Sequence, residues 1–127
     1  MGLEYLMDTN AVIDYIGQRL PDSGEKFIDD LTPKISVITR IELIGWFGVS
    51  SKQLTNLLLF AANATIYPLE ENVIVKAIEL RQKYRIKTPD AIIAATSIVH
   101  NCTLITNNSA DFKAIPEFLF VNPHKLN

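Results

Sequence analysis

Residues 88–99 read TPDAIIAATSIV, and the interpretation of the whole chain depends on this stretch. Its small and aliphatic residues predict a helix for the protein interior, yet the helix opens with Pro89 and Asp90. The helix dipole stabilises an acid in the first turn, so Asp90 can be explained as a helix-start residue alone. The alternative is that the chain needs an anion at this place, and the remaining sequence has to distinguish the two.

Short apolar runs alternate with amphipathic segments on both sides of this helix. Strands are predicted at residues 4–7, 34–38, 65–69, 103–106 and 118–121, the third at a sheet edge because of Pro68. Helices are predicted over residues 10–20, 22–31, 39–47, 50–62, 71–85 and 88–99. Strands that alternate with helices predict an α/β fold, in which a parallel sheet is covered on both faces.

The starts of three helices carry recognisable capping residues. Thr9 or Asn10 is predicted to cap the first helix. Thr39 and Glu42 have the spacing of a capping box, and residues 50–53 repeat that pattern. Glu42 therefore has a structural explanation of its own.

The composition predicts a single globular domain over residues 1–127. The chain is 48% hydrophobic and 20% charged, with Cys102 as its one cysteine, so it has no internal disulfide and fits a reducing compartment. His100 and His124 cannot supply a structural zinc site with that one cysteine. Early acids (Glu4 and Asp8) and short apolar runs argue against a signal peptide and a membrane span. We therefore expect a soluble, cytoplasmic protein.

Acids fall at the ends of the predicted strands. Asp8 follows the first strand, Glu42 lies one helical turn after the second, and Asp111 follows the fourth. Because parallel strands end at one edge of the sheet, these three are predicted to meet there. Asp90 joins them if its helix starts beside that edge, which periodicity does not settle. Taken singly, each acid also fits a cap or a turn.

Clustered carboxylates repel one another unless a cation neutralises them. Oxygen ligands without Cys or His indicate a hard cation, Mg²⁺ or Mn²⁺. The net charge of −2 and pI near 5.6 argue against tight non-specific binding of nucleic acid, but a bound cation would make the acidic patch attractive to phosphate. Such an ion can activate water and hold a phosphate oxygen, so the predicted chemistry is phosphodiester hydrolysis.

Four segments of the chain resemble one protein family. The strings LMDTNAVIDYI, ISVITRIELIG, IKTPDAIIAATSIVHNCTLITNN and ADF are similar, in that order, to PIN-domain ribonucleases of the VapC toxin type. The resemblance spans nearly the whole chain and implies a three-layer α/β/α sandwich with a short parallel sheet of four to five strands. It also implies a Mg²⁺- or Mn²⁺-dependent endoribonuclease that forms a homodimer and is inhibited by a small antitoxin protein.

Carried over position by position, the resemblance assigns roles to particular residues. The catalytic and metal-binding acids of the family fall on Asp8, Glu42, Asp90 and Asp111. Asn10 and Thr106 match polar positions that support these acids. Asn108 stands where many relatives have a further acid, so the number of metal ions stays open.

Basic and apolar side chains suggest surfaces for partners. A basic run around Tyr84 consists of Arg81, Lys83, Arg85 and Lys87. It either binds RNA phosphates or is simply the solvated face of a helix. Arg40, beside Glu42, is a better-placed candidate for phosphate. Residues 11–20, 41–47 and 54–62 carry more large apolar side chains than one face of each helix needs, which predicts an unusually thick core, a homodimer or another chain laid over them. The resemblance favours the last two, with an antitoxin that covers these helices and an Arg that reaches the acids.

Other functions predict different patterns. A haloacid-dehalogenase-type phosphatase needs a second Asp two residues after the first, where this chain has Asn10. A receiver domain needs paired acids at the first strand and a late Lys. The non-enzymatic alternative is an inactive PIN-like interaction module, against which the presence of all four acids argues.

Overall fold

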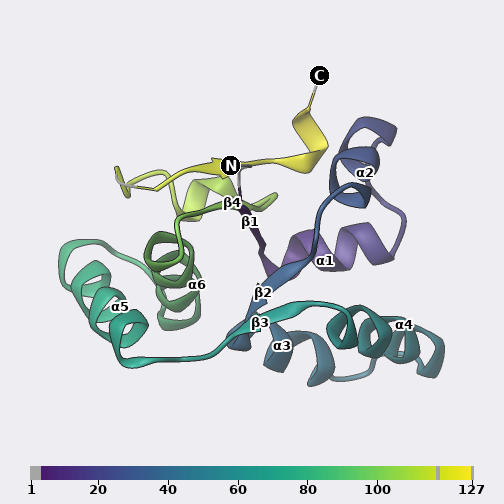
Figure 1. Ribbon diagram of the computed structural model, residues 1–127, viewed down its shortest axis with the longest axis horizontal. Coiled ribbons are helices and arrows are strands. Elements are labelled where there is room, and N and C mark those ends of the chain that lie inside the picture. Colours follow the sequence, from purple (N-terminus) through teal and green to yellow (C-terminus); the bar gives the residue numbers. More distant parts are fainter. Residues whose placement is uncertain (1–3, 117, 127) are drawn as a thin grey trace.

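The structure is a computed structural model that describes residues 4–116 and 118–126 (Figure 1). The strands are β1 (Glu4–Met7), β2 (Lys34–Ser36), β3 (Thr65–Tyr67), β4 (Cys102–Ile105) and β5 (Phe120–Val121). The helices are α1 (Thr9–Ile16), α2 (Asp22–Asp29), α3 (Val37–Ile44), α4 (Ser51–Ala62), α5 (Glu71–Lys83) and α6 (Thr88–Val99). Two 3-10 helices, η1 (Ser109–Asp111) and η2 (Pro123–Lys125), lie on either side of β5 in the sequence. The predicted alternation of strands and helices is confirmed.

The strands are parallel wherever they pair. β4 lies between β1 and β5, and β2 pairs with β3, which gives two hydrogen-bonded sets. The two sets meet where β1 lies beside β2, and an ion pair between Lys34 Nζ and Glu4 Oε1 (2.8 Å) joins them. β3 is at an edge, as predicted, but it ends at Tyr67, so Pro68 and Leu69 of the predicted strand lie outside it. The strands therefore end at a common edge, as the acid-cluster prediction requires.

Alternating side chains of the strands build a core on each face of the sheet. Leu6 and Leu104 pack with α5 and α6 on one face. Met7 and Ile105, the next residues along the same strands, pack with α1 to α4 on the other face. Figure 1 shows α5 and α6 on one side of the strands and α1 and α2 on the other. This is the predicted three-layer α/β/α arrangement.

Two helix starts differ from their predictions. Asp8, rather than Thr9 or Asn10, caps α1, because its side chain accepts a hydrogen bond from the backbone N–H of Thr9. Ser36 caps α3, and its hydroxyl accepts from the N–H of Thr39. The capping box predicted for Thr39 and Glu42 is therefore wrong, and β2 ends at Ser36 because the helix has already begun. The capping box at residues 50–53 is confirmed.

Several helices end earlier than predicted. α1 ends at Ile16, before Gly17, although Leu20 beyond it is still buried. α3 ends at Ile44, before Gly45, instead of continuing to Phe47. α5 ends at Lys83, and its boundary with α6 is a short extended connection. Among the residues that the structure describes, no helix has the length and apolar character needed to cross a membrane.

Candidate active site

Asp8 is the buried acid of the sheet edge. It follows β1 directly, and its backbone N–H donates to the carbonyl of Ile105 on β4 (2.9 Å). Its side chain is only 5% exposed. The position between the two central strands explains this burial, because helices cover both faces there.

The Asp8 carboxylate is held by three donors. Oδ1 accepts from the Thr9 N–H (2.8 Å), and Oδ2 accepts from the Thr106 hydroxyl (2.8 Å) and from Asn10 Nδ2 (3.3 Å). Burial raises the pKa of Asp8, and the Glu42 carboxylate raises it further, while the three hydrogen bonds oppose this rise. The supporting positions predicted for Asn10 and Thr106 are thus occupied by groups that contact Asp8.

Asp90 reaches the same edge from the first turn of α6. Burial raises the pKa of Asp90, and the carboxylates of Asp8, Asp111 and Glu42 raise it further, whereas the nearby Lys87 lowers it. The other three acids are therefore close enough to act on Asp90 electrostatically.

Glu42 lies on the exposed side of the edge. Its Oε1 accepts a hydrogen bond from the Thr9 hydroxyl, which also lies 3.1 Å from the hydroxyl of Thr39. The contact links α3 to the start of α1. With the capping box excluded, the Glu42 carboxylate is held by Thr9, and its charge contributes to the raised pKa of Asp8 and of Asp90.

The turn after β4 carries Asp111. The Asn108 N–H donates to Thr106 Oγ1 (3.0 Å), and the Asn108 side-chain amide donates to Asp111 Oδ2. Asn108 therefore binds an acid instead of supplying one. Thr106 links this turn to Asp8, because the same hydroxyl donates to Asp8 and accepts from Asn108.

A further acid of this region was missed from the sequence. Asp14 on α1 accepts a hydrogen bond from the Asn107 side-chain amide, and His124 Nε2 on η2 lies 2.8 Å from its Oδ2. The Asn107 N–H donates to Asn10 Oδ1 (3.3 Å). No spacing rule joins residues 14, 107 and 124, so the sequence carries no signal for this contact.

The donor set fits a hard divalent cation. The four acids of the edge offer oxygen atoms only, and repulsion between their carboxylates adds to burial in raising the pKa values of Asp8 and Asp90. Within residues 4–116 and 118–126, no group of three or more His, Cys, Asp or Glu side chains is already arranged to hold a metal ion. Binding would therefore require side-chain movement, for which the exposed Glu42 and Asp111 have room.

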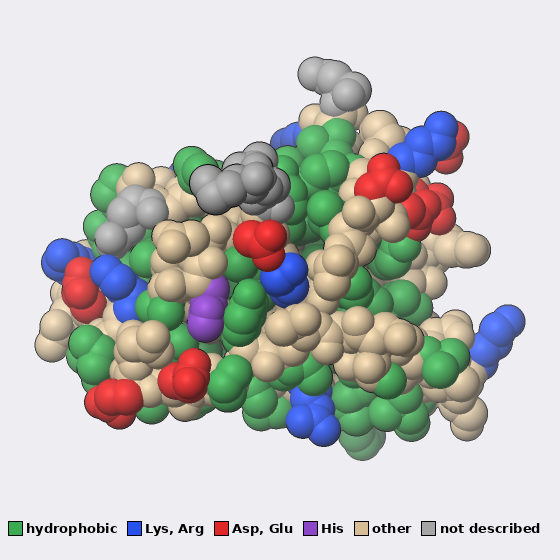
Figure 2. All heavy atoms as spheres, viewed as in Figure 1, with side chains coloured by type: hydrophobic (Ala, Val, Ile, Leu, Met, Phe, Trp, Pro, Cys, Tyr) green, Lys and Arg blue, Asp and Glu red, His purple; other side chains and the backbone are tan. Residues whose placement is uncertain are grey.

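The predicted basic residues occupy different environments. Lys87 is the one that acts on Asp90. Arg81 Nε donates to the carbonyl of Ile86 (3.2 Å), and Lys83 pairs with Glu79 (3.3 Å), so both are engaged in local structure. Arg40 and Arg85 are exposed. On the face drawn in Figure 2, Lys and Arg side chains are scattered and form no continuous band.

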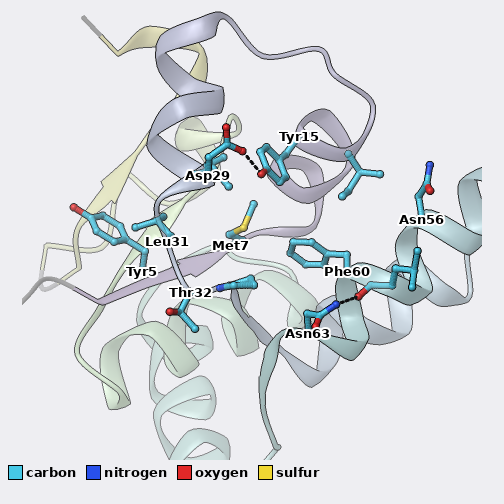
Figure 3. Close-up of a pocket in the computed structure, with 13 residues that line it drawn as sticks. Tyr5, Met7, Tyr15, Asp29, Leu31, Thr32, Asn56, Phe60 and Asn63 are labelled. Atoms are coloured by element: carbon cyan, nitrogen blue, oxygen red, sulfur yellow. Dashed lines mark hydrogen bonds between the residues drawn. The ribbon is translucent and has the colours of Figure 1, made fainter.

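A separate hollow of about 390 Å³ lies between α1, α2 and α4. Figure 3 shows Met7 and Phe60 at its floor and Asp29, hydrogen-bonded by the Tyr15 hydroxyl, at its rim. Burial and the Asp29 carboxylate raise the pKa of Tyr15 to about 12, so the phenol stays protonated. The four acids do not line this hollow, which is therefore a second feature of the surface.

The fold is that of a known family. Residues 5–117 match the PIN domain, and the chain belongs to the PIN-domain family. It is similar to Ribonuclease VapC2 of Rickettsia felis, with 32% identity over 135 residues that cover 93% of this chain and 96% of the relative. The resemblance to VapC-type PIN-domain proteins is confirmed.

Solved structures agree with this assignment. A chain of a toxin–antitoxin complex from Klebsiella pneumoniae is 30% identical, with a TM-score of 0.76 over 97% of this chain and 100% of that one. A chain of VapBC2 from Rickettsia felis, bound to a DNA fragment from their promoter, is 27% identical, with a TM-score of 0.78 over 94% and 98% of the two chains.

Proposed function

We propose that this PIN-domain protein is a VapC-type endoribonuclease, which hydrolyses RNA phosphodiester bonds with Mg²⁺ or Mn²⁺ as the toxin of a toxin–antitoxin pair. The observation that carries the proposal is the hydrogen-bonded edge around Asp8, in which Thr9 bonds both Asp8 and Glu42 and the turn from Thr106 carries Asp111. The charges of these three acids also act on Asp90, whose pKa is raised first by burial and then by them. Acids that a fold keeps together in this way suit a divalent cation. The ribonuclease name of the similar Rickettsia protein supports the same activity.

In this proposal the four acids hold the cation and their neighbours orient them. Thr106 and Asn10 fix the carboxylate of Asp8, Thr9 fixes Glu42, and Asn108 fixes Asp111. A divalent cation supplies positive charge to the phosphate oxygens and lowers the pKa of an attacking water. The free oxygens of Glu42 and Asp111 lie on the open side, where RNA can approach.

Cationic side chains beside the acids would hold the RNA backbone. Lys87 is the first candidate, because it already acts on Asp90, and the exposed Arg40 on α3 is the second. Arg81, Lys83 and Arg85 contribute less in this proposal, since two of them are engaged in local contacts. The protein then binds RNA mainly at the cation and does not need a broad basic surface.

Cleavage of RNA by the purified protein tests the function. We expect cleavage with Mg²⁺ or Mn²⁺, none with a chelator, and none with Asp8→Asn. Asp30→Asn is a matched control, because the substitution removes the same charge as Asp8→Asn. Asp30 is an exposed acid at the end of α2 and is remote in sequence from the four acids. An inactive wild type in both metals would leave the interaction-module alternative.

The partner in this proposal is a small antitoxin that covers the α1, α2 and α4 surface. Its apolar side chains would enter the hollow of Figure 3, and a basic side chain would pair with Asp29 at the rim. Leu59 on the lip of the hollow is 60% exposed, which leaves apolar area for a partner. An antitoxin Arg that reaches the acids would compete with the cation. Co-purification with the product of an adjacent gene checks this partner.

We further propose that two copies associate and that the protein works in the cytoplasm. Leu69 and Ile78 are exposed beside a shallow hollow of about 320 Å³ between α5 and α6. Phe47, after α3, is 98% exposed. Exposed apolar surfaces of this kind mark association sites. Light scattering checks the dimer, and the free thiol of Cys102 fits a reducing compartment.

A further inference from the structure

We propose that Asp14 is a positioning residue of the active site, which holds the acid-bearing turn at residues 106–111 through Asn107 and is itself held by His124. The inference rests on the proposed nuclease function for its effect on catalysis. Its structural part is independent of that function, because it concerns only how three distant segments are fixed to one another.

Asp14 receives two donors on the same carboxylate oxygen. The Asn107 side-chain amide donates to Oδ2, and His124 Nε2 lies 2.8 Å from that oxygen. Since a carboxylate only accepts, the His124 Nε2 carries the hydrogen. The side chains of Asp14 and His124 are 15% and 33% exposed, so water competes only in part for these contacts. One carboxylate thus ties α1, the turn after β4 and the C-terminal turn η2 together.

From Asn107 the connection continues to the acids. The backbone N–H of Asn107 donates to Asn10 Oδ1, and Asn10 Nδ2 donates to Asp8 Oδ2 (both 3.3 Å). The next residue, Asn108, donates to Asp111. A displaced Asn107 would therefore disturb the support of Asp8 on one side and the placement of Asp111 on the other.

The far end of the connection is anchored independently. η2 begins with the Asn122 side chain accepting from the His124 N–H (2.9 Å). It packs on α2 at Gly24, where an added Cβ would lie 2.1 Å from the carbonyl oxygen of Pro123. Any larger residue at position 24 must push η2 away. His124 is thus brought to Asp14 by close backbone packing, and the carboxylate is fixed from outside the active site.

A purely structural role for Asp14 makes a different prediction. If it only fastens η2 to α1, its loss lowers overall stability and leaves the turn at residues 106–111 and catalysis unchanged. A positioning role requires a local effect on that turn. Amide hydrogen exchange of Asn107 and Asn108 measures the turn directly, in the metal-free protein and without any nuclease assay.

The test compares Asp14→Ala, Asp14→Asn and Asn107→Ala with the charge-matched control Asp30→Asn. We expect Asp14→Ala to lower kcat about 10-fold at saturating Mg²⁺ with little change in KM, as for groups that orient metal ligands. Amide exchange at Asn107 and Asn108 should be several-fold faster. Combining Asp14→Ala with Asn107→Ala should add little to the exchange of the turn, because both remove the hydrogen bond between Asn107 and Asp14, although Asp14→Ala also removes the His124 contact. Asp14→Asn keeps one acceptor oxygen and should show a smaller loss.

The outcomes separate this inference from the proposed function. Asp14→Ala with wild-type exchange at Asn107 and Asn108 overturns the inference, even if the protein melts earlier. If this variant does not fold, exchange in Asn107→Ala and Asp14→Asn decides between the two roles in the same way. If the wild type cleaves no RNA, the proposed function fails, and faster amide exchange in the variants still supports the inference that Asp14 holds the turn at residues 106–111.

Discussion

The carboxylates at the two ends of the strands have different environments. At the amino edge, Glu4 pairs with Lys34 at 2.8 Å, and the hydrogen bond from Lys34 to Glu4 raises the pKa of the Lys34 ammonium despite partial burial. At the carboxyl edge, none of the four acids forms an ion pair within the described residues. The pKa values of Asp8 and Asp90 rise there instead.

The difference shows that this chain can balance a carboxylate at a strand end when nothing else is required of it. Placing a Lys opposite Glu4 needed only one residue on the neighbouring strand. At the carboxyl edge, burial and neighbouring carboxylates raise the pKa values of Asp8 and Asp90 in spite of the hydrogen bonds to Asp8 and the nearby Lys87. In the proposed function, a divalent cation would balance this negative charge.

The largest expected effect is on catalysis by Asp90→Asn. Loss of a residue that holds the cation should lower RNA cleavage by more than the roughly 100-fold that loss of an orienting group costs. The fold should survive, because Asn in the first helical turn removes repulsion from three carboxylates. Initial rates of RNA cleavage and circular dichroism of the same preparation measure both quantities.

Glu4→Gln is the control at the amino edge, since it removes a carboxylate from the same sheet and should leave cleavage unchanged. As a helix-start residue only, Asp90→Asn would lose a few tenths to about 1 kcal/mol of helix-dipole stabilisation and keep full activity. Full activity of Asp90→Asn would therefore mean that Asp90 at the carboxyl edge matters no more for cleavage than Glu4 at the amino edge.

The second effect is stabilisation by metal. A cation bound only by the folded protein should raise the free energy of unfolding by about 2.7 kcal/mol at a hundredfold excess over its Kd. Asp8→Asn should blunt this response and leave the metal-free protein as stable or more so. Thermal melts with Mg²⁺, Mn²⁺ or a chelator measure it, and a wild type indifferent to both metals would contradict the cation site.

The third effect concerns pH in the metal-free protein. The folded-state pKa values of Asp8 and Asp90 lie above their usual 3.8, so the folded protein binds protons more tightly than the unfolded chain. Their stabilising contribution is complete below pH 3.8 and is lost as the pH rises through the raised values. Asp8→Asn/Asp90→Asn should therefore gain stability over the wild type at neutral pH, and this gain should shrink on acidification.

Denaturant unfolding with chelator at a series of pH values measures that difference. Glu4→Gln serves again as the control, because it removes a carboxylate whose environment is balanced. If the difference in unfolding free energy between the wild type and the double variant stays constant with pH, the charges of Asp8 and Asp90 do not destabilise the folded protein.

The smallest effect is expected at the amino edge itself. Lys34→Met keeps the apolar stem and removes the charge, and the partner Glu4 is 51% exposed at its side chain. A partly solvated ion pair contributes about 0.2–1 kcal/mol, so the unfolding free energy should fall by no more than this. Cleavage should be unaffected. A larger loss would mean that the balanced edge contributes more to stability than its exposure suggests.

The sheet edge was predictable because the rules that build it are local. Short apolar runs in 4–7 and 103–106 predict strands, and parallel strands bring Asp8 and Asp111, which follow them, to one end. Helix boundaries were less predictable where two caps compete. The β-branched run at 34–38 suggested a longer strand, but the Ser36 hydroxyl starts α3 earlier, and this shift frees Glu42 from the capping box.

Tertiary contacts between distant residues could not be predicted. The position of Asp90 depends on where α6 starts relative to the sheet, which periodicity does not determine. Asp14 looked like an ordinary surface acid of an amphipathic helix. Pairing of β4 with β1 brings Asn107 to Asp14, and packing of η2 on α2 brings His124 to it. The sequence around residue 14 does not indicate either of these tertiary contacts.

Pairing between β1 and β4 also sets the order in which the molecule is assembled. Tyr5 faces Thr103 in this ladder, so β1 cannot pair until a segment almost a hundred residues later in the chain has been synthesised. Contacts of such large sequence separation form slowly and only after the intervening chain is available. Asp8 receives the Thr106 hydroxyl in the same step. During synthesis on the ribosome, the growing chain therefore carries Asp8 long before Thr106 is available to hold its carboxylate.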